Sequence, residues 1–161
     1  MNEVCKDGVY DGYLDLSGLT SAVGLKLPTE ISGSLYLRGL TSAQGLVLPQ
    51  FVGGDLDLRG LTSAKDLVLP KSVGGGLDLG GLTSAKGLVL PQSVGGSLNL
   101  GSLTSAQGLV LPQSVGYLDL SSLTSAKDLV LSQSVGGYLN LGGLTSAEHE
   151  EVLAKWKEAV P

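Results

Sequence analysis

The chain contains 161 residues, of which 42% are hydrophobic and only 4% are aromatic, and its formal net charge at pH 7 is −5. This mildly acidic balance argues against nucleic acids and anionic membranes as partners, because both are bound by concentrated Lys and Arg. A single cysteine, Cys5, excludes an internal disulfide. No apolar run approaches the roughly 18 residues of a membrane span, and the first residues lack signal-peptide character, so we expect a cytoplasmic protein by default.

Leucines recur at a fixed interval through most of the chain. The first leucine of a Leu-x-Leu motif returns every 21 residues, with one step of 20 where Val115-Gly116 lacks the second glycine of the usual pair. These leucines are Leu14, Leu35, Leu56, Leu77, Leu98, Leu118 and Leu139. One such unit cannot bury its own leucines, so each coil must cover the next. The repeat therefore predicts an all-β fold, a single parallel β-solenoid of seven coils.

Three regions follow from this repeat, namely an N-terminal cap over 1–12, the solenoid repeats over 13–144 and a capping helix over 145–161. In each repeat the motif x-Leu-x-Leu-x, for example 55–59, predicts a strand with both leucines facing inward and the x positions facing outward. The motif Leu-Val-Leu, for example 67–69, predicts a second strand that ends at a proline.

Two corners connect these predicted strands. In the corner Gly-Leu-Thr-Ser-Ala-x-Gly, the threonine is typical of an N-cap, and a single helical or 3₁₀ turn is expected after it. The residue that closes this corner is Gly or Asp, and these two exchange most easily where the dihedral angle φ is positive. We therefore expect positive φ at Gly24, Gly45, Asp66, Gly87, Gly108 and Asp128. The other corner, Ser-Val-Gly-Gly, is interpreted as a bend made by glycine.

The last residues predict an amphipathic α-helix that closes the stack. Thr145 and Glu148 have the spacing of a capping box. The apolar face of this helix consists of Val152, Leu153, Trp156, Ala159 and Val160. We expect Trp156 to cover the open end of the last coil.

The Leu-x-Leu, Leu and Leu-x-Leu-Pro rhythm over residues 13–147 resembles bacterial leucine-rich-repeat-like solenoids. The sequence departs from that pattern where the family has a polar residue after the strand, because Leu19, Leu40, Leu61 and their equivalents stand there. The resemblance implies a binding or scaffold role and supplies no catalytic residues.

Motifs for chemistry are nearly absent from the sequence. With one cysteine and one histidine, His149, the chain offers no Cys/His zinc site. Gly74-Gly75-Gly76 followed by Leu77 and Asp78 departs from the calcium motif Gly-Gly-x-Gly-x-Asp at its fourth position. We therefore expect a protein that is not an enzyme, without metal or cofactor.

The outward positions around the first strand vary most from coil to coil, and they include four of the five tyrosines. The candidate partner-binding residues on this face are Tyr13, Tyr36, Arg38, Asp57, Arg59, Asp78, Tyr117 and Tyr138. Asp57 and Asp78 occupy the same column in adjacent coils, as a carbohydrate-cleaving pair would. Alternatively, the arginines in the neighbouring column neutralise them as ordinary cross-strand charge pairs.

Two further rows run along the predicted stack. If the leucines of Leu-Val-Leu face inward, the valines form an outward apolar stripe, which marks either an interface or only a residue favoured in strands. A homodimer through Val68, Val89 and Val110, or through the thin N-terminal end, is one expectation. The Thr-Ser rows permit an ice-binding interpretation, but capping hydrogen bonds explain them without a ligand.

These observations favour a non-enzymatic protein-binding or structural scaffold module that presents the variable strand face to an unknown protein partner. A carbohydrate-binding or carbohydrate-active solenoid is the first alternative. A self-associating structural element is the second alternative.

Overall fold

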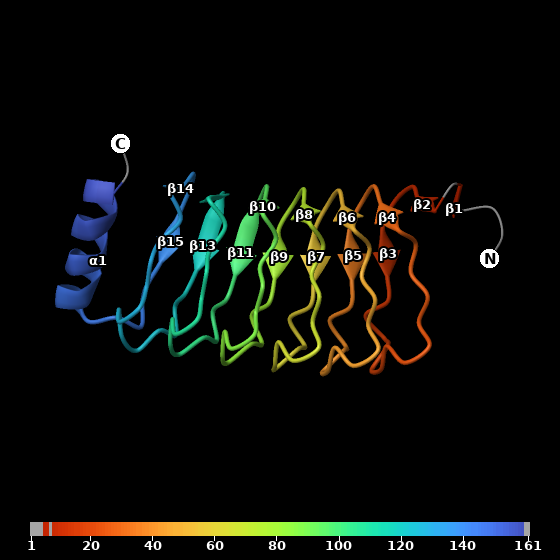
Figure 1. Ribbon diagram of the computed structural model, residues 1–161, viewed down its shortest axis with the longest axis horizontal. Helices are drawn as coiled ribbons and strands as arrows, with labels where there is room; N and C mark the ends of the chain where they lie inside the picture. The colour runs from red at the N-terminus through yellow and green to blue at the C-terminus, as the bar shows by residue number, and fades with distance from the viewer. Residues whose placement is uncertain (1–4, 7, 160–161) are drawn as a thin grey trace.

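The computed structural model describes residues 5–6 and 8–159, and these form a parallel β-solenoid closed at its C-terminal end by one α-helix (Figure 1). The coils stack in a straight row from the N-terminus to the helix (Figure 1). The predicted fold class is therefore confirmed. None of the described helical residues forms a segment long and apolar enough to cross a membrane.

A seven-stranded parallel sheet forms one side of the solenoid, with one strand from each repeat. Its strands are β3 (Leu14–Asp15), β5 (Leu35–Tyr36), β7 (Leu56–Asp57), β9 (Leu77–Asp78), β11 (Ser97–Asn99), β13 (Tyr117–Asp119) and β15 (Leu139–Asn140). Equivalent leucines lie opposite one another, for example Leu56 and Leu77. The predicted first strand of the repeat is confirmed. Its register is confirmed as well, because equivalent residues of neighbouring coils pair with each other.

The second set of strands lies at the Ser-Val dipeptides and at their equivalents Glu30–Ile31 and Phe51–Val52. These strands are β4 (Glu30–Ile31), β6 (Phe51–Val52), β8 (Ser72–Val73), β10 (Ser93–Val94), β12 (Ser114–Val115) and β14 (Ser134–Val135). At the N-terminal end, β2 (Val9–Tyr10) pairs with β4 in parallel and β1 (Cys5–Lys6) pairs with β2 in an antiparallel orientation. Strands β12 and β14 form a separate two-stranded sheet.

The prediction of a second strand at Leu67–Leu69 is wrong, because this segment and its equivalents form no ladder. The backbone N–H of Leu67 is already used within its own coil, where it donates to the carbonyl of Ala64 at 3.1 Å. Pro70 has no N–H to donate. Two of the four residues of this segment therefore offer no backbone N–H to a neighbouring coil.

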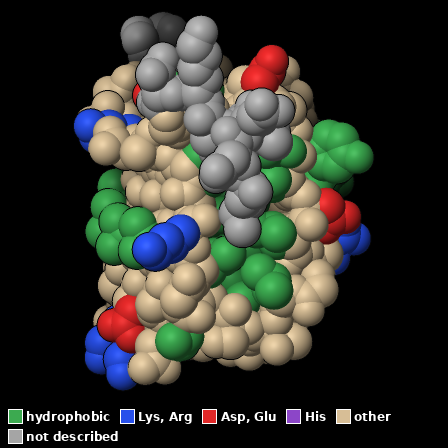
Figure 2. Space-filling view, turned by 90° about the vertical axis from the view of Figure 1, so that its right-hand side faces the viewer, with side chains coloured by type: hydrophobic (Ala, Val, Ile, Leu, Met, Phe, Trp, Pro, Cys, Tyr) green, Lys and Arg blue, Asp and Glu red, His purple; other side chains and the backbone are tan. Residues whose placement is uncertain are grey.

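The leucines of the seven-stranded sheet form the core. From the second to the sixth repeat, both leucines of the motif are 0–1% exposed. Each such side chain contributes about 1.5–3 kcal/mol when fully buried. Residues Leu14 and Leu16 of the first repeat are only half-buried. Hydrophobic side chains are correspondingly visible at the N-terminal end of the stack (Figure 2).

In the repeats before the last, the corner after the first strand is a tight turn with the i+3→i hydrogen bond of a 3₁₀ turn, and none of its residues belongs to a helix. In the third repeat, the N–H of Leu67 donates to the carbonyl of Ala64, and Asp66, the second of the two residues between them, has φ of 62°. All six positions predicted to have positive φ have it. The prediction that threonine caps this corner is wrong, because the hydroxyl of Ser63 accepts the N–H of Lys65 instead. A threonine does cap the helix in the last repeat.

The other corner is confirmed as a glycine bend, although its Ser-Val half belongs to a strand. The glycines of successive coils stack directly, with Gly75 N–H donating to the carbonyl of Gly54 at 2.9 Å. A Cβ added at Gly74 would lie 2.2 Å from the carbonyl oxygen of Gly53. Close approach of two backbones therefore requires glycine here.

Helix α1 (Ser146–Ala159) closes the last coil. The Thr145 hydroxyl accepts the N–H of Glu148 at 3.3 Å, and the Glu148 carboxylate accepts the N–H of Thr145 at 3.2 Å, so the predicted capping box is confirmed. Val152 is buried, whereas Trp156 is half-buried, and the side chain of Ala159 lies outside the described ones. The prediction that Trp156 covers the end of the stack holds only in part, and Val160 lies outside the described residues.

The indole of Trp156 is fixed by one hydrogen bond. Its N–H donates to the carbonyl oxygen of Ser132 at 2.7 Å. Ser132 occupies the place that proline has in the preceding repeats, for example Pro112. Its hydroxyl is buried and has no partner among the described residues. The sixth repeat is thus modified where the helix packs on it.

Candidate functional site

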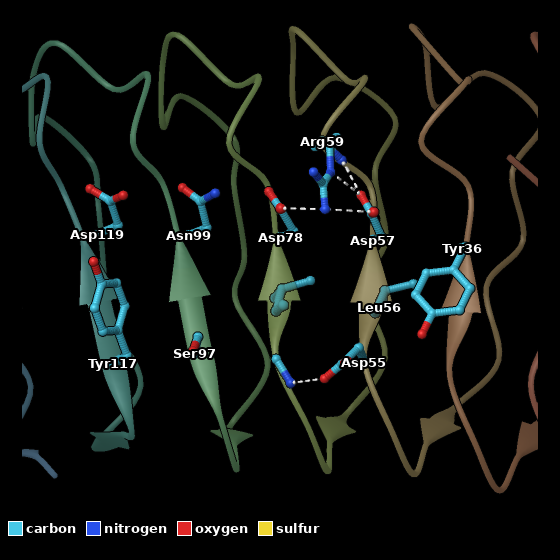
Figure 3. A pocket seen from close by; sticks show the side chains of 12 residues that line it. Tyr36, Asp55, Leu56, Asp57, Arg59, Asp78, Ser97, Asn99, Tyr117 and Asp119 are labelled. Carbon is cyan, nitrogen blue, oxygen red and sulfur yellow. Dashed lines mark hydrogen bonds and ion pairs between the residues drawn. The ribbon is translucent and has the colours of Figure 1, made fainter. Parts of the chain in front are cut away.

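A shallow hollow of about 390 Å³ lies on the outer surface of the seven-stranded sheet. Tyr36 from β5 borders it at one end and Tyr117 from β13 at the other, with β7, β9 and β11 between them (Figure 3). Four strand spacings separate the two tyrosines, which corresponds to about 19 Å. We call this hollow the tyrosine trough.

Small side chains form the floor of the tyrosine trough. Gly76 and Ser97 stand in the outward column that carries Asp55 on one side and Tyr117 on the other. The difference in side-chain size between neighbouring coils therefore creates the hollow, while the backbone beneath it stays regular.

The one-residue deletion in the repeat acts at the Tyr117 end of the trough. Only Gly116 precedes Tyr117, where the third, fourth, fifth and seventh repeats have two glycines after the valine. Strands β11 and β13 are each three residues long, and Ser97 pairs directly with Tyr117. Tyr117 is half-buried, whereas Tyr138 in the next repeat is 61% exposed. The tyrosine of the shortened repeat is thus the more buried of the two.

A column of Asp and Asn side chains runs along the trough with a structural function. Each accepts the backbone N–H two residues ahead, as Asp78 does from Gly80 and Asn99 from Gly101, both at 2.9 Å. Such Asx turns fix the exit from each strand. One oxygen of each Asp57, Asp78 and Asp119 carboxylate is occupied in this way.

Arg59 bridges two of these carboxylates. Its guanidinium Nη2 lies 2.9 Å from Asp57 Oδ2 and 3.2 Å from Asp78 Oδ2 (Figure 3). The hydrogen bond to Asp57, together with the charge of Asp78, raises the pKa of Arg59. The Asp57 side chain is only 6% exposed, so this pair is tied more firmly than an ordinary surface pair.

Arg38 lies beside the tyrosine trough rather than in it. Its Nε donates to the hydroxyl of Ser17 at 2.8 Å, and its guanidinium carbon lies 5.8 Å from the ring centre of Tyr36. Hydrogen bonds from Ser17, with a smaller contribution from the charge of Arg38, lower the pKa of Asp15. Arg38 therefore supports Tyr36 and the first coil.

The structure brings together five of the eight candidate binding residues. Tyr36, Asp57, Arg59, Asp78 and Tyr117 line the trough. Arg38 stands next to Tyr36, and the Tyr138 ring packs against that of Tyr117 with centroids 5.5 Å apart. Tyr13 is 68% exposed on the first coil, away from the hollow.

Four polar residues that were not among the eight candidates also line the trough, although the repeat predicts them at outward positions of the same face. These are Asp55, Ser97, Asn99 and Asp119. All four stand at outward positions of the same strands, so their column in the repeat was the available signal. What the sequence lacked was a reason to choose the middle coils over the end coils. Within residues 5–6 and 8–159, no group of three His, Cys, Asp or Glu side chains is placed to hold a metal ion.

The valines of the Leu-Val-Leu segments face outward, as predicted. Val47, Val68, Val89, Val110 and Val130 are between 73% and 77% exposed. These residues lie on the stretch of chain between the tight turn and the Ser-Val strands, and not on the seven-stranded sheet. We call them the valine stripe.

No protein-family model, no curated protein and no solved structure matches this chain. The repeat-solenoid fold therefore stands on the geometry alone, and the leucine-rich-repeat resemblance stands on the sequence pattern.

Proposed function

We propose that this solenoid is a non-enzymatic binding module that holds an extended segment of a partner protein in the tyrosine trough. The observation that carries the proposal is the hollow between Tyr36 and Tyr117 on an otherwise regular sheet. About six residues of extended chain span about 19 Å, so the trough has the length of a short peptide segment. Tyrosine is among the residue types that most often anchor interfaces.

The charge of the trough favours a cationic segment. Four aspartates line the trough, Asp55, Asp57, Asp78 and Asp119, against the single cation Arg59. Arg59 contacts Asp57 and Asp78, while Asp119 lies beside Tyr117 at the far end (Figure 3). A Lys or Arg side chain placed there gains both the carboxylate and the face of an aromatic ring.

The trough is preorganised for binding. Its strands are hydrogen-bonded to neighbours on both sides, and its Asp and Asn side chains are held by Asx turns. A rigid surface loses little conformational entropy on binding, which favours affinity for a given contact area.

The Asp57–Asp78 pair is poorly suited to acid–base catalysis. A general acid at neutral pH needs a carboxyl whose protonated form is favoured. Both carboxylates are instead engaged by the Arg59 guanidinium, and each also accepts a backbone N–H. This arrangement supports a role in binding and in fixing the strand edge.

A carbohydrate is the second candidate ligand, and one specific observation favours it. The Asn99 amide and the Asp119 carboxylate lie next to the Tyr117 ring (Figure 3), which combines hydrogen-bonding groups with an aromatic face. Sugar rings use both kinds of contact, one for hydroxyl groups and one for their apolar faces.

Arrays of ten-residue peptides with basic, neutral or acidic composition, and a glycan array, test the proposal directly. We expect the wild-type chain to bind basic peptides, and the variant Tyr36→Ser/Tyr117→Ser/Asp119→Ser to lose at least ten-fold in affinity. Tyr13→Ser is the matched control, because Tyr13 is an exposed tyrosine of the same sheet outside the trough. Binding of glycans alone would favour the second candidate. Equal peptide affinity in both variants, or no ligand on either array, contradicts the trough as a binding site.

A further inference from the structure

The residue two places after each Asp or Asn of the Asx column differs between the coils of the tyrosine trough. In the third repeat this residue is Arg59, whereas in the fourth and fifth repeats it is Gly80 and Gly101. The strands that precede it are hydrogen-bonded in one continuous sheet. The same backbone position therefore carries a guanidinium in one coil and no side chain two coils further along.

The third repeat shows how a guanidinium is held at this position. Arg59 Nε donates to Asp57 Oδ1 at 2.9 Å, and Nη2 lies 2.9 Å from Asp57 Oδ2 and 3.2 Å from Asp78 Oδ2. Asp57 and Asp78 pair directly across strands β7 and β9. Two neighbouring members of the column thus form a clamp that holds one guanidinium between two coils (Figure 3).

The fifth repeat has an equivalent clamp in which glycine replaces the arginine. Asn99 and Asp119 pair across strands β11 and β13 in the same register. A Cβ added at Gly101 would lie 3.1 Å from Asn99 Oδ1 and 3.3 Å from Asp119 Oδ2, so both oxygens converge on the space beside this glycine. Asp119 Oδ1 accepts the N–H of Ser121, whereas Oδ2 has no partner among the described residues. We call Asn99, Gly101 and Asp119 the open clamp.

Gly80 does not offer the same environment, although it is also a glycine. A Cβ added there would lie 2.8 Å from Asn99 Nδ2 and 3.0 Å from Asp78 Oδ1. The N–H of Gly101 donates to Asn99 Oδ1 and thereby sets the orientation of this amide. The amide therefore turns a donor toward Gly80 and an acceptor toward Gly101. Because a guanidinium carries only donors, it fits beside Gly101 and not beside Gly80.

We propose that the open clamp receives the guanidinium of an arginine supplied by the partner segment. The guanidinium bridges Asn99 Oδ1 and Asp119 Oδ2, as Arg59 bridges its two aspartates. This inference rests on the proposed function and adds the residue type that the trough selects. The open clamp contains one carboxylate, so one guanidinium neutralises it. Tyr117 stands two residues before Asp119 on the same face of strand β13, where its ring can pack against the arginine.

Lysine fits the open clamp less well than arginine. An ammonium group is a compact charge whose donors all lie on one nitrogen. A planar guanidinium presents donors on separate nitrogens and can reach two acceptors at once. The open clamp is therefore expected to distinguish the two basic residue types, which a merely acidic surface does not.

Three ten-residue peptides that differ only at one central residue test the proposal. That residue is arginine, lysine or citrulline, which keeps the shape of arginine without its charge, and the rest of each peptide is neutral. Isothermal titration calorimetry with the wild-type chain should show at least ten-fold tighter binding of the arginine peptide. An arginine peptide that binds no more tightly than the lysine or citrulline peptide overturns the proposal. Binding of all three that is lost in Tyr36→Ser/Tyr117→Ser/Asp119→Ser would leave the proposed function standing.

Gly101→Arg tests the position by supplying the arginine from the chain itself. The new side chain stands where Arg59 stands in the third repeat, so the variant should fold like the wild type and lose at least ten-fold in affinity for the arginine peptide. Gly142→Arg is the matched control, because it adds the same charge where a Cβ would meet a single oxygen, Asn140 Oδ1 at 3.2 Å. The control should bind like the wild type. Equal affinity in the two variants contradicts the open clamp as the arginine site.

Ethylguanidinium tests the open clamp without any peptide. In NMR spectra of the wild type, it should shift the side-chain amide signals of Asn99 at least twice as far as ethylammonium does at the same concentration. The same shift should be absent from Gly101→Arg. Asn99 signals that respond equally to both ions, or to neither, overturn the proposal even if a peptide binds in the trough. A response to ethylguanidinium alone, with no peptide bound, would support the open clamp and remove the proposed function.

Discussion

The two long sides of the solenoid hold neighbouring coils together by different interactions. On the seven-stranded sheet, backbone hydrogen bonds join every coil to the next, and the outward side chains vary freely between Tyr, Asp, Asn, Ser and Gly. On the Leu-Val-Leu side there is no ladder, and the outward residue is valine in five consecutive coils. Where the backbone fixes the spacing of the coils, side chains are available for other functions. Where it does not, side-chain packing between the rungs contributes more.

The largest expected difference between the two sides lies in their inward leucines. Leu58 of the sheet is 0% exposed, whereas Leu69 of the opposite side is half-buried. Leu58→Ala should lower the free energy of unfolding by about 2–5 kcal/mol, and Leu69→Ala by less than half of that. Urea denaturation followed by circular dichroism measures both. Equal losses would show that the two sides contribute alike to the core.

At the C-terminal end of the stack, Trp156 of helix α1 contributes both packing and a hydrogen bond. Trp156 is half-buried and donates one hydrogen bond to Ser132. Trp156→Ala should therefore cost about 2–3 kcal/mol, below the range for a fully buried tryptophan. Trp156→Phe keeps most of the apolar contact and should cost only about 1 kcal/mol, the value of the lost hydrogen bond. Thermal melts of both variants distinguish the contribution of packing from that of the hydrogen bond. An unchanged melting temperature in Trp156→Ala would mean that the indole does not stabilise the end of the stack.

The capping box of the helix predicts a pH dependence. Thr145→Ala should cost about 1 kcal/mol, as for other N-caps. Hydrogen bonds from Thr145, first from its hydroxyl and then from its backbone, and from the backbone of Ala126, lower the pKa of Glu148 below its ordinary 4.5. A lowered folded-state pKa stabilises the protein above pH 4.5, and this stabilisation is lost as the pH falls through the folded-state value.

The variant Glu148→Gln isolates the charge, because glutamine also occurs in capping boxes. The difference in melting temperature between wild type and this variant should shrink as the pH falls below 4.5. A difference that stays constant with pH would remove ionisation of Glu148 as the cause.

The smallest expected effect concerns the outward residues of the sheet. Asp78 accepts the N–H of Gly80, and Asn99 does the same for Gly101 in the next coil. Asp78→Asn should therefore change the free energy of unfolding by less than about 0.5 kcal/mol. Asp78→Ala, which leaves the N–H of Gly80 without its acceptor, should cost about 1 kcal/mol. If both variants are equally destabilised, the ion pair with Arg59 matters more than the Asx turn.

Several local features could be predicted from the repeat alone. Asp66 and Asp128 were predicted to have positive φ because they replace glycine at one position of the repeat, and their φ values are 62° and 64°. Thr145 and Glu148 were predicted to cap the helix from their spacing alone. In the other repeats the threonine prediction failed, because the glycine or aspartate that follows permits a tighter turn than a helix. Local sequence signals therefore succeeded where no other segment competed for the same hydrogen bonds.

The sequence by itself determined the number of repeats, the inward leucines and the residues of positive φ, because stacking imposes the same requirement on every coil. Only the tertiary structure decided which second segment pairs into a ladder. Leu-Val-Leu has the better strand pattern, but its first N–H is taken by a turn and a proline follows it, and the strand pairs form at Ser-Val and its equivalents instead. The tertiary structure also decided the place of the tyrosine trough. That hollow exists because Tyr36 and Tyr117, 81 residues apart in the chain, stand on either side of coils with small side chains.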